Sequence, residues 1–569
     1  MTLRSETPRH FAHWPAGTPR QIPTADTTLW ENLEITARRY PGRTAFIFFG
    51  RELTFRELFD SVESLAGWLS ERAGVAAGDR VILMTQNSPQ FVIAFYAVMR
   101  LGAIVVPVNP MVRAPELPHY ISDGEVRVAI ATADVAGELI TANETMPDGQ
   151  GLNAILVGRY PDMMPEPLPA GEAPPAAWHG WLYAPMPIAP RCTAWADAIG
   201  AGLQPPPYRG KADDLVALAY TSGTTGKPKG CMHSHRTIGH NVMAAPLWNR
   251  LSAADVGLAV VPMFHITGML FAMHTPIYLG ATSVLLPRWD RDLAGRAIAR
   301  YRVTTWTNIP TMVIDLLASP RVADYDLSSL RSISGGGAAM PMAVAERLFD
   351  TYGLRYSEGY GLTETAAPSH QNPPHNPKRQ CLGIPTIGTD ARIIDPQTLE
   401  ELGPGEQGEI MIRGPQVFLG YWRNPEASEE AFVTIDGLRF FRSGDLGTTD
   451  EDGYFFITDR LKRMINASGF KVWPAEVENM LYKHPDIQEA CVISAHDPYR
   501  GETVKAVVVL REASRGKVGA EQIEAWAREQ MAAYKVPRLV QFVDALPKSG
   551  SGKVMWRLLQ EQENAHGGH

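Results

Sequence analysis

The sequence predicts an α/β protein with a large N-terminal domain and a small α+β C-terminal domain. Apolar runs at 81–84 and 104–108 are typical of short buried strands, and the segment 88–100 between them has the pattern of a helix. This alternation indicates mostly parallel sheets with helices on both faces. A chain of 569 residues is too long for one hydrophobic core, so we expect at least two domains.

A helix start is visible early in the chain. Thr54-Phe-Arg-Glu57 has the form of a capping box, in which a threonine hydroxyl and a glutamate carboxylate satisfy the first backbone N–H groups. Apolar residues then recur at helical spacing before the stop signal Gly74, namely Leu58, Val62, Leu65 and Leu69.

A proline-rich stretch separates this region from the middle of the chain. Twelve prolines lie between Pro161 and Pro207, with Trp178, Trp181 and Trp195 among them. We interpret it as an irregular, tryptophan-anchored excursion over the surface. Further strand-like runs follow at 215–219, 257–261, 283–286 and 304–306.

The last third of the chain changes in character. The runs 410–413 and 454–457 indicate a smaller, more antiparallel section. Beyond 459–463 the pattern predicts helices at 474–482 and 520–533 and strands at 490–494 and 505–510. We therefore predict a large domain over residues 1–461 and a small α+β domain over residues 462–569, which is long enough to fold as a unit.

Composition and charge restrict the class of protein. Hydrophobic and charged fractions of 45% and 20% are those of a globular protein, and the net charge of 53 − 61 = −8 argues against a nucleic-acid-binding surface. The N-terminus lacks the plan of a signal peptide, and no apolar run approaches the ~20 residues that span a bilayer. Four cysteines without metal-ligand spacing favour reduced thiols and a cytoplasmic location: Cys192, Cys231, Cys381 and Cys491. Peripheral membrane contact stays open, as does the choice between monomer and homodimer.

The most informative string follows the strand-like run 215–219. Tyr220-Thr-Ser-Gly-Thr-Thr-Gly-Lys-Pro-Lys-Gly230 packs three glycines, two lysines and four Ser/Thr residues into eleven positions. Such a loop can bring backbone N–H groups, hydroxyls and ammonium groups up to a polyphosphate. It is not a Walker A loop. That motif would need Gly at position 221, which is Thr221 here, and Ser or Thr at position 228, which is Pro228. The alternative is an ordinary glycine-rich surface loop.

A second string, Tyr356-Ser-Glu-Gly-Tyr-Gly-Leu-Thr-Glu-Thr365, combines close backbone approach with useful side chains. Tyr360 offers a stacking face, and Glu364 offers a carboxylate for a hard cation or, alternatively, a solvated surface acid. Upstream of it, Gly335-Gly-Gly337 follows the run 330–334 and reads either as a flexible turn or as a site of close ligand approach.

Four further segments lie toward the C-terminus. Asp445 in 441–446 and Arg460 in 459–463 could hold hydroxyl and phosphate oxygens, or be a turn residue and a surface cation. The third and fourth of these segments are Ser468-Gly-Phe-Lys-Val-Trp-Pro-Ala-Glu-Val-Glu478 and Pro547-Lys-Ser-Gly-Ser-Gly-Lys553, and each places a lysine after glycine.

Taken in order, these strings resemble the signatures of the adenylate-forming superfamily, which comprises acyl-CoA synthetases, adenylation domains and firefly-type luciferases. The matches extend from about residue 27 to residue 557. The resemblance implies an enzyme that joins a carboxylic acid to AMP, releases pyrophosphate, and then passes the acyl group to CoA. It implies ATP and CoA as substrates and Mg²⁺ as the metal.

The resemblance also assigns the site residues. It implies a catalytic set of Lys553, Glu364, Thr221 and His265, with Thr221 and Glu364 on the metal and Lys553 on the carboxylate and α-phosphate. The residues implied for ATP or AMP binding are Thr221, Ser222, Gly223, Thr224, Thr225, Gly226, Lys229, Gly335, Gly336, Gly337, Glu358, Gly359, Tyr360, Gly361, Thr363, Asp445, Arg460 and Lys553.

For the second step, the resemblance implies a CoA segment and a hinge. Lys462 would be the hinge about which the small domain rotates, and the residues near CoA would be Ser468, Gly469, Phe470 and Lys471. The chain departs from the pattern at Asp459, where Gly is commoner, and at Trp556, where a basic residue is usual.

The acid is the least determined part. Pro262-Met-Phe-His-Ile-Thr-Gly-Met269 is similar to the family's acyl-pocket motif, and its acyl-pocket residues would be His265, Ile266, Gly268 and Met269. The motif has no cation or large aromatic after His265, which favours an apolar acid, and the N-terminal half looks like bacterial medium- and long-chain fatty acyl-CoA synthetases. Aryl or branched acids stay open, as do a carrier protein as acyl acceptor, a luciferase-like oxygenase and a non-catalytic nucleotide-binding member.

Overall fold

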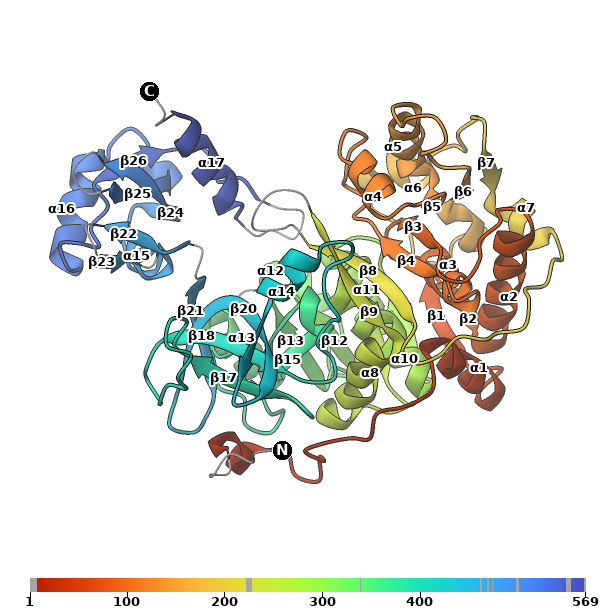
Figure 1. The fold of residues 1–569 in the computed structure, drawn as a ribbon, viewed down its shortest axis with the longest axis horizontal. Coiled ribbons are helices and arrows are strands. Elements are labelled where there is room, and N and C mark those ends of the chain that lie inside the picture. Colours follow the sequence, from red (N-terminus) through yellow and green to blue (C-terminus); the bar gives the residue numbers. More distant parts are fainter. Residues whose placement is uncertain are drawn as a thin grey trace. The chain divides into compact units, whose positions relative to one another are not determined.

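The protein is described by a computed structural model that covers residues 8–221, 228–337, 339–460, 463–467, 470–472, 474–497, 501–548 and 554–566. Two compact units divide the chain. The first comprises Met1–Ala391, Ile412–Phe441 and Glu451–Phe455, and the second comprises Arg392–Met411, Arg442–Asp450 and Phe456–His569. The large parallel sheets belong to the first unit, and a C-terminal α+β body belongs to the second (Figure 1).

A nine-stranded sheet forms the larger half of the first unit. Its order is β16-β15-β14-β13-β12-β10-β11-β1-β2, with parallel central strands and antiparallel strands at both ends. The strands are β1 (Thr44–Phe48), β2 (Arg51–Thr54), β10 (Val256–Ala259), β11 (Thr282–Leu285), β12 (Thr305–Asn308), β13 (Ser332–Gly336), β14 (Tyr356–Leu362), β15 (Ala367–Gln371) and β16 (Ile384–Pro385).

A seven-stranded sheet forms the other half. Its order is β7-β6-β5-β3-β4-β8-β9, and it is parallel except for the final antiparallel pair β8–β9. The strands are β3 (Arg80–Met84), β4 (Ile104–Pro107), β5 (Val128–Thr132), β6 (Ala154–Gly158), β7 (Cys192–Ala194), β8 (Leu215–Thr221) and β9 (Lys229–Ser234).

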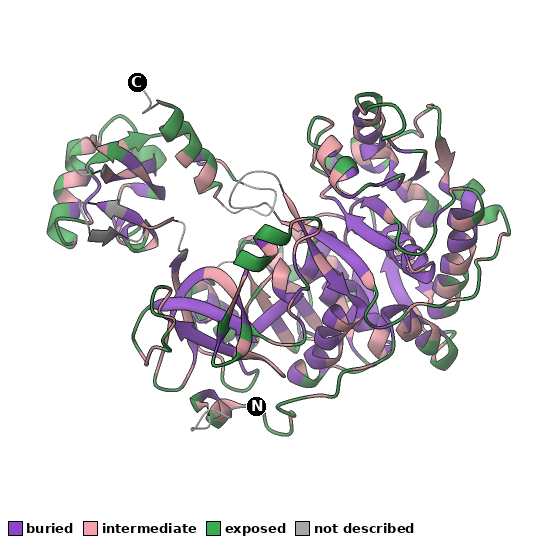
Figure 2. Cartoon of the chain, viewed as in Figure 1, coloured by how far each residue is buried: buried purple, intermediate pink, exposed green. Residues whose placement is uncertain are grey.

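Helices cover both sheets, and the strands beneath them are buried (Figure 2). Helix α3 is buried along its whole length because it packs against α2 and the strands β3 and β4. The α-helices of this part are α1 (Leu29–Arg39), α2 (Phe55–Glu71), α3 (Pro89–Arg100), α4 (Leu117–Asp123), α5 (Ala133–Glu144), α6 (His179–Leu182), α7 (Trp195–Gly200), α8 (His235–Asn249), α9 (Ile266–Gly268), α10 (Thr275–Leu279), α11 (Arg291–Tyr301), α12 (Pro310–Leu317), α13 (Met342–Tyr352) and α14 (Pro425–Glu430). The shorter turns are the 3₁₀ helices η1 (Arg9–His13), η2 (Tyr160–Met163), η3 (Ala176–Trp178), η5 (Val322–Asp324) and η6 (Thr363–Thr365) and the π-helix η4 (Met269–His274).

A smaller sheet of five strands follows in the chain. Its order is β17-β18-β20-β19, with β21 paired to β20. The strands are β17 (Asp390–Ile394), β18 (Gly408–Arg413), β19 (Phe432–Ile435), β20 (Leu438–Thr449) and β21 (Phe455–Arg460). Together with the two parallel sheets it confirms the fold class predicted for the large domain.

The C-terminal body is built on the order β23-β22-β25-β24, with β26 parallel to β25. Its strands are β22 (Ile465–Ala467), β23 (Phe470–Val472), β24 (Ile487–Asp497), β25 (Gly501–Leu510) and β26 (Leu539–Phe542), and its helices are α15 (Pro474–Leu481), α16 (Ala520–Gln530), α17 (Trp556–His566) and the 3₁₀ turn η8 (Glu512–Ser514). Because strand side chains alternate, Val492 and Val508 face the core beneath α15 and α16, whereas Ile493 and Val507 face Leu559 of α17.

The helix start predicted at Thr54 is confirmed in full. Thr54 Oγ1 accepts from Glu57 N at 3.2 Å, and Glu57 Oε2 accepts from Thr54 N at 2.8 Å. The Thr54 N–H and the Thr54 hydroxyl both donate to the Glu57 carboxylate, and these two bonds lower its pKa. The prediction for 161–207 was only partly right, because β7 pairs with β6 there and α7 begins at Trp195. Helix α17, whose start at Trp556 follows the last glycine-rich string, was not predicted.

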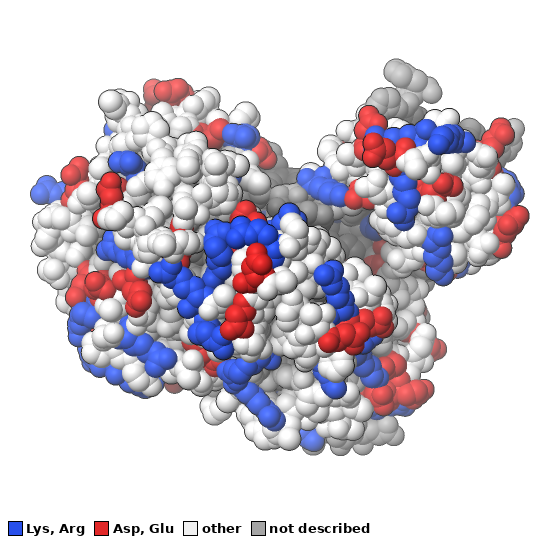
Figure 3. All heavy atoms as spheres, turned by 180° about the vertical axis from the view of Figure 1, so that it is seen from behind, with Lys and Arg blue, Asp and Glu red and all other residues white. Residues whose placement is uncertain are grey.

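The surface and the thiols agree with the composition. Acidic and basic side chains are mixed over the face drawn in Figure 3. All four cysteines are unbridged, and three of them are buried. In the described part of the chain, no helix combines the length and the apolar character that crossing a membrane requires.

Candidate functional site

The β8–β9 hairpin carries the string from Tyr220 to Gly230. The two strands pair in the register Tyr220↔Gly230 and Thr221↔Lys229, so the predicted metal ligand and the predicted phosphate lysine face each other across the ladder. The remaining predicted loop residues lie outside the described residues: Ser222, Gly223, Thr224, Thr225 and Gly226.

Both feet of this hairpin are tied to helix α4. The Tyr220 hydroxyl donates to Asp123 Oδ2 at 2.6 Å, and His119 Nε2 lies 2.7 Å from the carbonyl oxygen of Pro228. A carbonyl can only accept, so Nε2 of His119 carries the proton. Trp422 completes the clamp, because its indole N–H donates to Asp123 O at 3.0 Å and its backbone N–H to Gly230 O at 2.8 Å. The ends of strands β8 and β9 are thereby fixed by residues that are far away in the sequence.

A cavity of about 420 Å³ opens beside these feet. Its wall includes Lys229, and the other charged or ionisable residues that line it are His119, Asp123, Arg423, Glu426 and Glu430. Both cations and carboxylates line it, so the cavity has no single sign of charge.

Lys229 and Glu364 are linked through one tyrosine. The Lys229 ammonium lies 5.1 Å from the centre of the Tyr421 ring, and the Tyr421 hydroxyl donates to Glu364 Oε1 at 2.9 Å. Burial and the nearby Glu364 carboxylate raise the pKa of Tyr421, so this hydroxyl stays a donor. The same two causes raise the pKa of the Cys231 thiol, which excludes a thiolate nucleophile here. The structure therefore brings two of the predicted nucleotide-site residues into one cluster.

The second hairpin, β14–β15, carries Tyr360, and its connection is the turn η6, which contains Thr363 and Glu364. The imidazole of His233 donates from Nε2 to Thr363 O at 2.7 Å, and burial lowers its pKa to about 4, so it is neutral at pH 7. The Asn241 amide donates to Ala366 O at 2.8 Å. Strand β9 and helix α8 thus hold the backbone on both sides of Glu364.

The Tyr360 ring has an aromatic neighbour. Its centre lies 5.6 Å from that of His370, which is fully buried. Burial lowers the pKa of His370 to about 3. A neutral imidazole behind the tyrosine leaves the ring as an uncharged stacking surface, as the predicted adenine contact requires.

Glu358 holds neighbouring backbone through hydrogen bonds, a role that its place in the motif did not indicate. Its carboxylate accepts from the backbone N–H groups of Met340 at 2.6 Å and Cys381 at 3.1 Å, and the residue is buried. Burial raises its pKa, while the N–H donors oppose that rise. Both carboxylate oxygens are therefore engaged in holding two loops to β14.

The glycines of β13 and β14 are required because neighbouring backbone and side-chain atoms leave no room for a Cβ atom. A Cβ on Gly335 would lie 2.1 Å from the Tyr356 hydroxyl, one on Gly336 would lie 2.5 Å from Gly359 O, and one on Gly361 would lie 1.8 Å from Ala367 O. Gly337 has φ +83°, which favours glycine. These contacts explain the three-glycine turn and the Y-G pattern without reference to a ligand.

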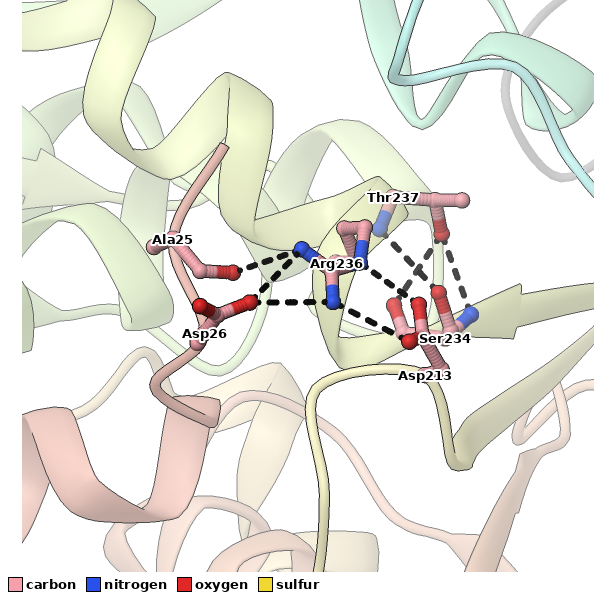
Figure 4. A network of polar contacts seen from close by, with 6 residues as sticks. All are labelled: Ala25, Asp26, Asp213, Ser234, Arg236 and Thr237. Atoms are coloured by element: carbon pink, nitrogen blue, oxygen red, sulfur yellow. Dashed lines mark hydrogen bonds and ion pairs between the residues drawn. The ribbon is translucent and has the colours of Figure 1, made fainter. Parts of the chain in front are cut away.

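Helix α8 begins directly after β9 and is anchored by Arg236 (Figure 4). Its guanidinium donates to Asp213 at 2.5 and 3.0 Å, to Asp26 at 3.3 Å and to Ala25 O at 3.1 Å. Ser234 caps the helix by accepting from Thr237 N at 3.2 Å. The strand that bears Lys229 therefore ends in a well-fixed helix.

The predicted acyl motif forms one continuous helical run, α9–η4–α10. His265 precedes it and is exposed, Gly268 lines a narrow cavity, and Ile266 and Met269 are buried in the main core. The cavity's other helical lining comes from Phe271 and Ala272, which the sequence did not single out. Met269 does not line this cavity, and its predicted place along an acyl path stays a prediction.

The remaining predicted residues lie in the second unit or outside the described residues. Asp445 is buried on β20, in a turn that Glu409 braces by accepting from Gly444 N at 3.0 Å and pairing with Arg442 at 2.7 Å. Arg460 ends β21, and Phe470 and Lys471 open β23. Lys462, Ser468, Gly469 and Lys553 lie outside the described residues.

Several polar contacts join the segments around Asp459 in the second unit. Asp459 Oδ2 accepts from Ala475 N at 2.7 Å, and Arg463 pairs with Glu478. The Arg463 guanidinium also lies 5.5 Å from the centre of the Trp556 ring. Both departures from the family pattern, at Asp459 and Trp556, therefore have structural uses here.

The predicted metal ligands are an oxygen pair, Thr221 and Glu364. No group of three or more histidine, cysteine, aspartate or glutamate side chains that could hold a metal occurs among the described residues. The Thr221 hydroxyl and the Glu364 carboxylate are donors of the kind that Mg²⁺ prefers, and two protein oxygens suffice when substrate phosphates supply others.

Sequence reasoning missed His119, Asp123, Tyr421 and Trp422. Each acts on the site across a long sequence separation, 299 residues for the Trp422–Asp123 bond. The string Tyr421-Trp422 offered the only local signal, a pair of aromatics next to glycine.

The fold and these strings define a class of protein. The family described as AMP-binding enzyme matches residues 33–422, and its C-terminal domain family matches residues 476–553. The chain belongs to the AMP-binding enzyme family, which confirms the adenylate-forming resemblance.

Full-length relatives are similarly informative. The chain is 36% identical over 559 residues to the long-chain-fatty-acid–CoA ligase of Bacillus subtilis (strain 168), covering 97% of this chain and 98% of the relative. It is 37% identical over 522 residues to the feruloyl-CoA synthase of Amycolatopsis sp., covering 91% and 96%.

Solved structures share the fold. ATP-bound MatB from Rhodopseudomonas palustris superposes with a TM-score of 0.78 at 29% identity, covering 94% of this chain and 99% of that one. A fatty acyl CoA synthetase of Mycobacterium tuberculosis superposes with a TM-score of 0.73 at 27% identity, covering 95% and 99%.

Proposed function

We propose that this chain is an AMP-forming acyl-CoA synthetase that uses ATP, a carboxylic acid and CoA. The observation that carries the proposal is the cluster of Lys229, Tyr421 and Glu364 beside the β8–β9 hairpin. In this proposal the Lys229 cation would neutralise phosphate oxygens and the Glu364 carboxylate would hold a metal. Family membership and full-length relatives that are named as CoA ligases or synthases support it.

The proposed chemistry has two steps. A carboxylate oxygen of the acid attacks the α-phosphorus of ATP, the bond to pyrophosphate breaks, and an acyl adenylate forms. The CoA thiolate then attacks the acyl carbon, and AMP leaves. The difficulty of the first step is bringing an anion onto a polyanion, so positioned positive charge is the main contribution that the protein can make.

The chain's own residues divide this work. Lys229 and the hydroxyl and N–H groups of the loop 221–227 would cradle phosphate, Thr221 and Glu364 would hold Mg²⁺, and Lys553 would bridge the carboxylate and the α-phosphate. When bound, Mg²⁺ supplies charge neutralisation on the phosphate oxygens. Tyr360 and the turn 335–337 would pack against adenine, with Asp445 and Arg460 on the ribose and phosphate oxygens. His265 would lie between adenine and the acyl group.

The second step would use the small domain. We place its boundary at residue 462, with Lys462 as the hinge and Ser468, Gly469, Phe470 and Lys471 near CoA. Lys553 and the 468–471 segment serve different steps although they belong to the same domain, and a rotation about Lys462 would reconcile these roles.

For the acid, we propose a medium- or long-chain fatty acid. The Bacillus subtilis relative is named for that class, and the helical run after His265 is apolar. An aryl acid is the second candidate, because the feruloyl-CoA synthase relative is equally similar in sequence. A carrier protein in place of CoA is the third.

The enzyme would work in the cytoplasm, since its four cysteines are unbridged and three of them are buried. Peripheral contact with a membrane would suit a fatty acid substrate, and either a monomer or a homodimer is compatible with a site built within one chain.

Pyrophosphate release with a panel of acids tests the proposal. Straight-chain acids from C2 to C16, benzoate, phenylacetate and ferulate are offered with ATP and Mg²⁺, with and without CoA. We expect acid-dependent pyrophosphate release, CoA-dependent AMP release, and the highest kcat/KM for a medium or long chain. If no acid stimulates pyrophosphate release, the proposed synthetase activity is refuted. An optimum at ferulate would instead change the proposed substrate from a fatty acid to an aryl acid.

A further inference from the structure

A narrow cavity lies between the nine-stranded sheet and the π-helix η4. Its volume is about 20 Å³, close to the minimum for one water molecule. The helical wall is Gly268, Phe271 and Ala272, and the sheet wall comes from β10, β11 and β12 together with Val261. A π-turn of this kind is often found at functional sites.

The sheet wall of this slot is polar. Ser283, Thr305 and Thr307 line it, and the register pairs Gly257 with both Ser283 and Thr305, so these side chains share one face of the sheet. Gly257 leaves the room between them. A Cβ built there would lie 3.5 Å from Thr305 Oγ1 and 3.9 Å from Ser283 Oγ.

Ser283 carries the strongest indication of a ligand. It is 1% exposed, and its Oγ has no hydrogen-bond partner among the residues that the structure describes. A buried hydroxyl left unpaired costs free energy, so such groups nearly always have a partner. An otherwise apolar pocket with a few convergent polar groups is how a protein selects a polar substituent on a ligand.

The slot is also at a useful distance from the proposed reaction centre. Thr305 pairs with Ser332, whereas Asn308, three residues further along β12, pairs with Gly335 of the three-glycine turn. At ~3.3 Å per strand residue, the slot lies roughly 10 Å along the sheet from that turn. A group bound there belongs to the part of the acid remote from its carboxylate.

We propose that the acid bears a hydroxyl or ether oxygen remote from its carboxylate, and that Ser283, with Thr305 and Thr307, selects it. This rests on the proposed acyl-CoA synthetase activity and narrows its substrate class. It applies to a hydroxylated alkyl chain and to a hydroxylated or methoxylated ring alike, because the recognised chemistry is the oxygen.

Matched acid pairs test the proposal in both settings. The pairs are decanoate with 10-hydroxydecanoate and cinnamate with 4-hydroxycinnamate, and the quantity is kcat/KM for CoA ester formation. In the wild type we expect the oxygenated member of at least one pair to exceed its parent by tenfold or more. In Ser283→Ala that ratio should fall to about 1.

Two further variants keep the test decisive. Gly257→Ala adds a methyl group at ordinary contact distance, so the protein should fold while the slot is filled and the oxygen preference is lost. Ser332→Ala removes a hydroxyl from β13, outside the slot, and should keep the preference. Thermal unfolding of each variant confirms that it is folded.

The outcomes separate the two proposals. Parent acids that match or exceed their oxygenated partners in the wild type, or a preference that survives in Ser283→Ala, would show that the slot holds only water and would overturn the inference. Failure of all four acids to give a CoA ester, together with no response in the wider acid panel, would instead refute the synthetase activity.

Discussion

Two hairpins near the ends of the two large sheets differ in how they are held. The β8–β9 hairpin is tied at its feet by groups from elsewhere in the chain, namely His119, Asp123 and Trp422. The β14–β15 hairpin is braced along its length by buried groups, among them Glu358 and Asn372, whose amide donates to Glu358 O at 3.1 Å.

This difference separates two kinds of motif glycine. In β14 the glycines are fixed by packing, because any side chain on Gly361 would collide with backbone. In the β8–β9 string, the described glycine, Gly230, would place a Cβ 3.2 Å from the Tyr220 ring, which is tight but not prohibitive. Packing therefore accounts for the glycine at position 361 of the β14–β15 string, whereas it does not by itself require the glycine at position 230 of the β8–β9 string.

The largest expected effect comes from a charge that neither hairpin supplies. Lys553→Ala should reduce acyl-adenylate formation by about 10³-fold, the upper range for removing one group that stabilises transition-state charge. Thioester formation from presynthesised acyl-AMP and CoA should be largely kept, and pyrophosphate exchange and single-turnover thioesterification measure the two steps.

Lys548→Ala is the matched control for that variant, since its ammonium pairs with Glu489 at 2.5 Å on the surface. It should change neither step by more than about twofold. Equal losses of both steps in Lys553→Ala would remove Lys553 from its proposed role in adenylation.

The next effect tests the charge on the β14–β15 side. Glu364→Ala should lower kcat for adenylation by about 10²-fold and raise the Mg²⁺ concentration needed for half-maximal rate. Tyr421→Phe, which removes only the 2.9 Å hydrogen bond to Glu364, should cost about tenfold or less. Wild-type rates for Glu364→Ala at limiting Mg²⁺ would contradict the metal assignment.

A third prediction concerns the stability of the braced hairpin. Glu358→Ala leaves the buried N–H groups of Met340 and Cys381 without their acceptor, so the free energy of unfolding should fall by about 2–4 kcal/mol. Chemical denaturation measures it. Glu346→Ala, which breaks an exposed pair with Arg379 at 2.7 Å, should change it by no more than about 0.5 kcal/mol. If Glu358→Ala keeps the wild-type free energy of unfolding but binds ATP more weakly, this prediction is wrong and Glu358 contacts the nucleotide instead.

The smallest effect tests the tied hairpin. His119→Ala removes the 2.7 Å hydrogen bond to Pro228 O, and KM for ATP should rise about fivefold with kcat little changed. His119→Gln keeps an N–H donor and should restore most of the affinity, whereas exposed His179→Ala should have no effect. Equal behaviour of the alanine and glutamine variants would mean that the hydrogen bond does not position the loop.

The sequence was most informative where a signal is local. The capping box at Thr54, the alternation that gives β3, α3 and β4, and the glycine-rich strings are all written in consecutive residues, and the structure confirms the elements they predict. The boundaries moved by a few residues because neighbouring strands and caps, rather than hydrophobicity, decide where an element ends.

The rest depends on contacts that no local pattern encodes. The link from Lys229 through Tyr421 to Glu364 joins three separate segments, and the clamp of Trp422 on Asp123 joins two more. Gly268, Phe271 and Ala272 have the i, i+3, i+4 spacing of one helical face, but only the packing against β10, β11 and β12 shows that this face borders the slot.

The hydrogen bond from the Trp422 indole to Asp123 can form only late during synthesis of the chain. Trp422 follows Asp123 by 299 residues, so at ~5–20 residues per second a ribosome needs about 15–60 s to deliver the group that completes the clamp. Until then the β8–β9 hairpin lacks one of its three ties, although both of its strands have long been made. A chain that stops short of residue 422 would therefore contain both strands of the hairpin but lack the tie that Trp422 makes to Gly230 and Asp123.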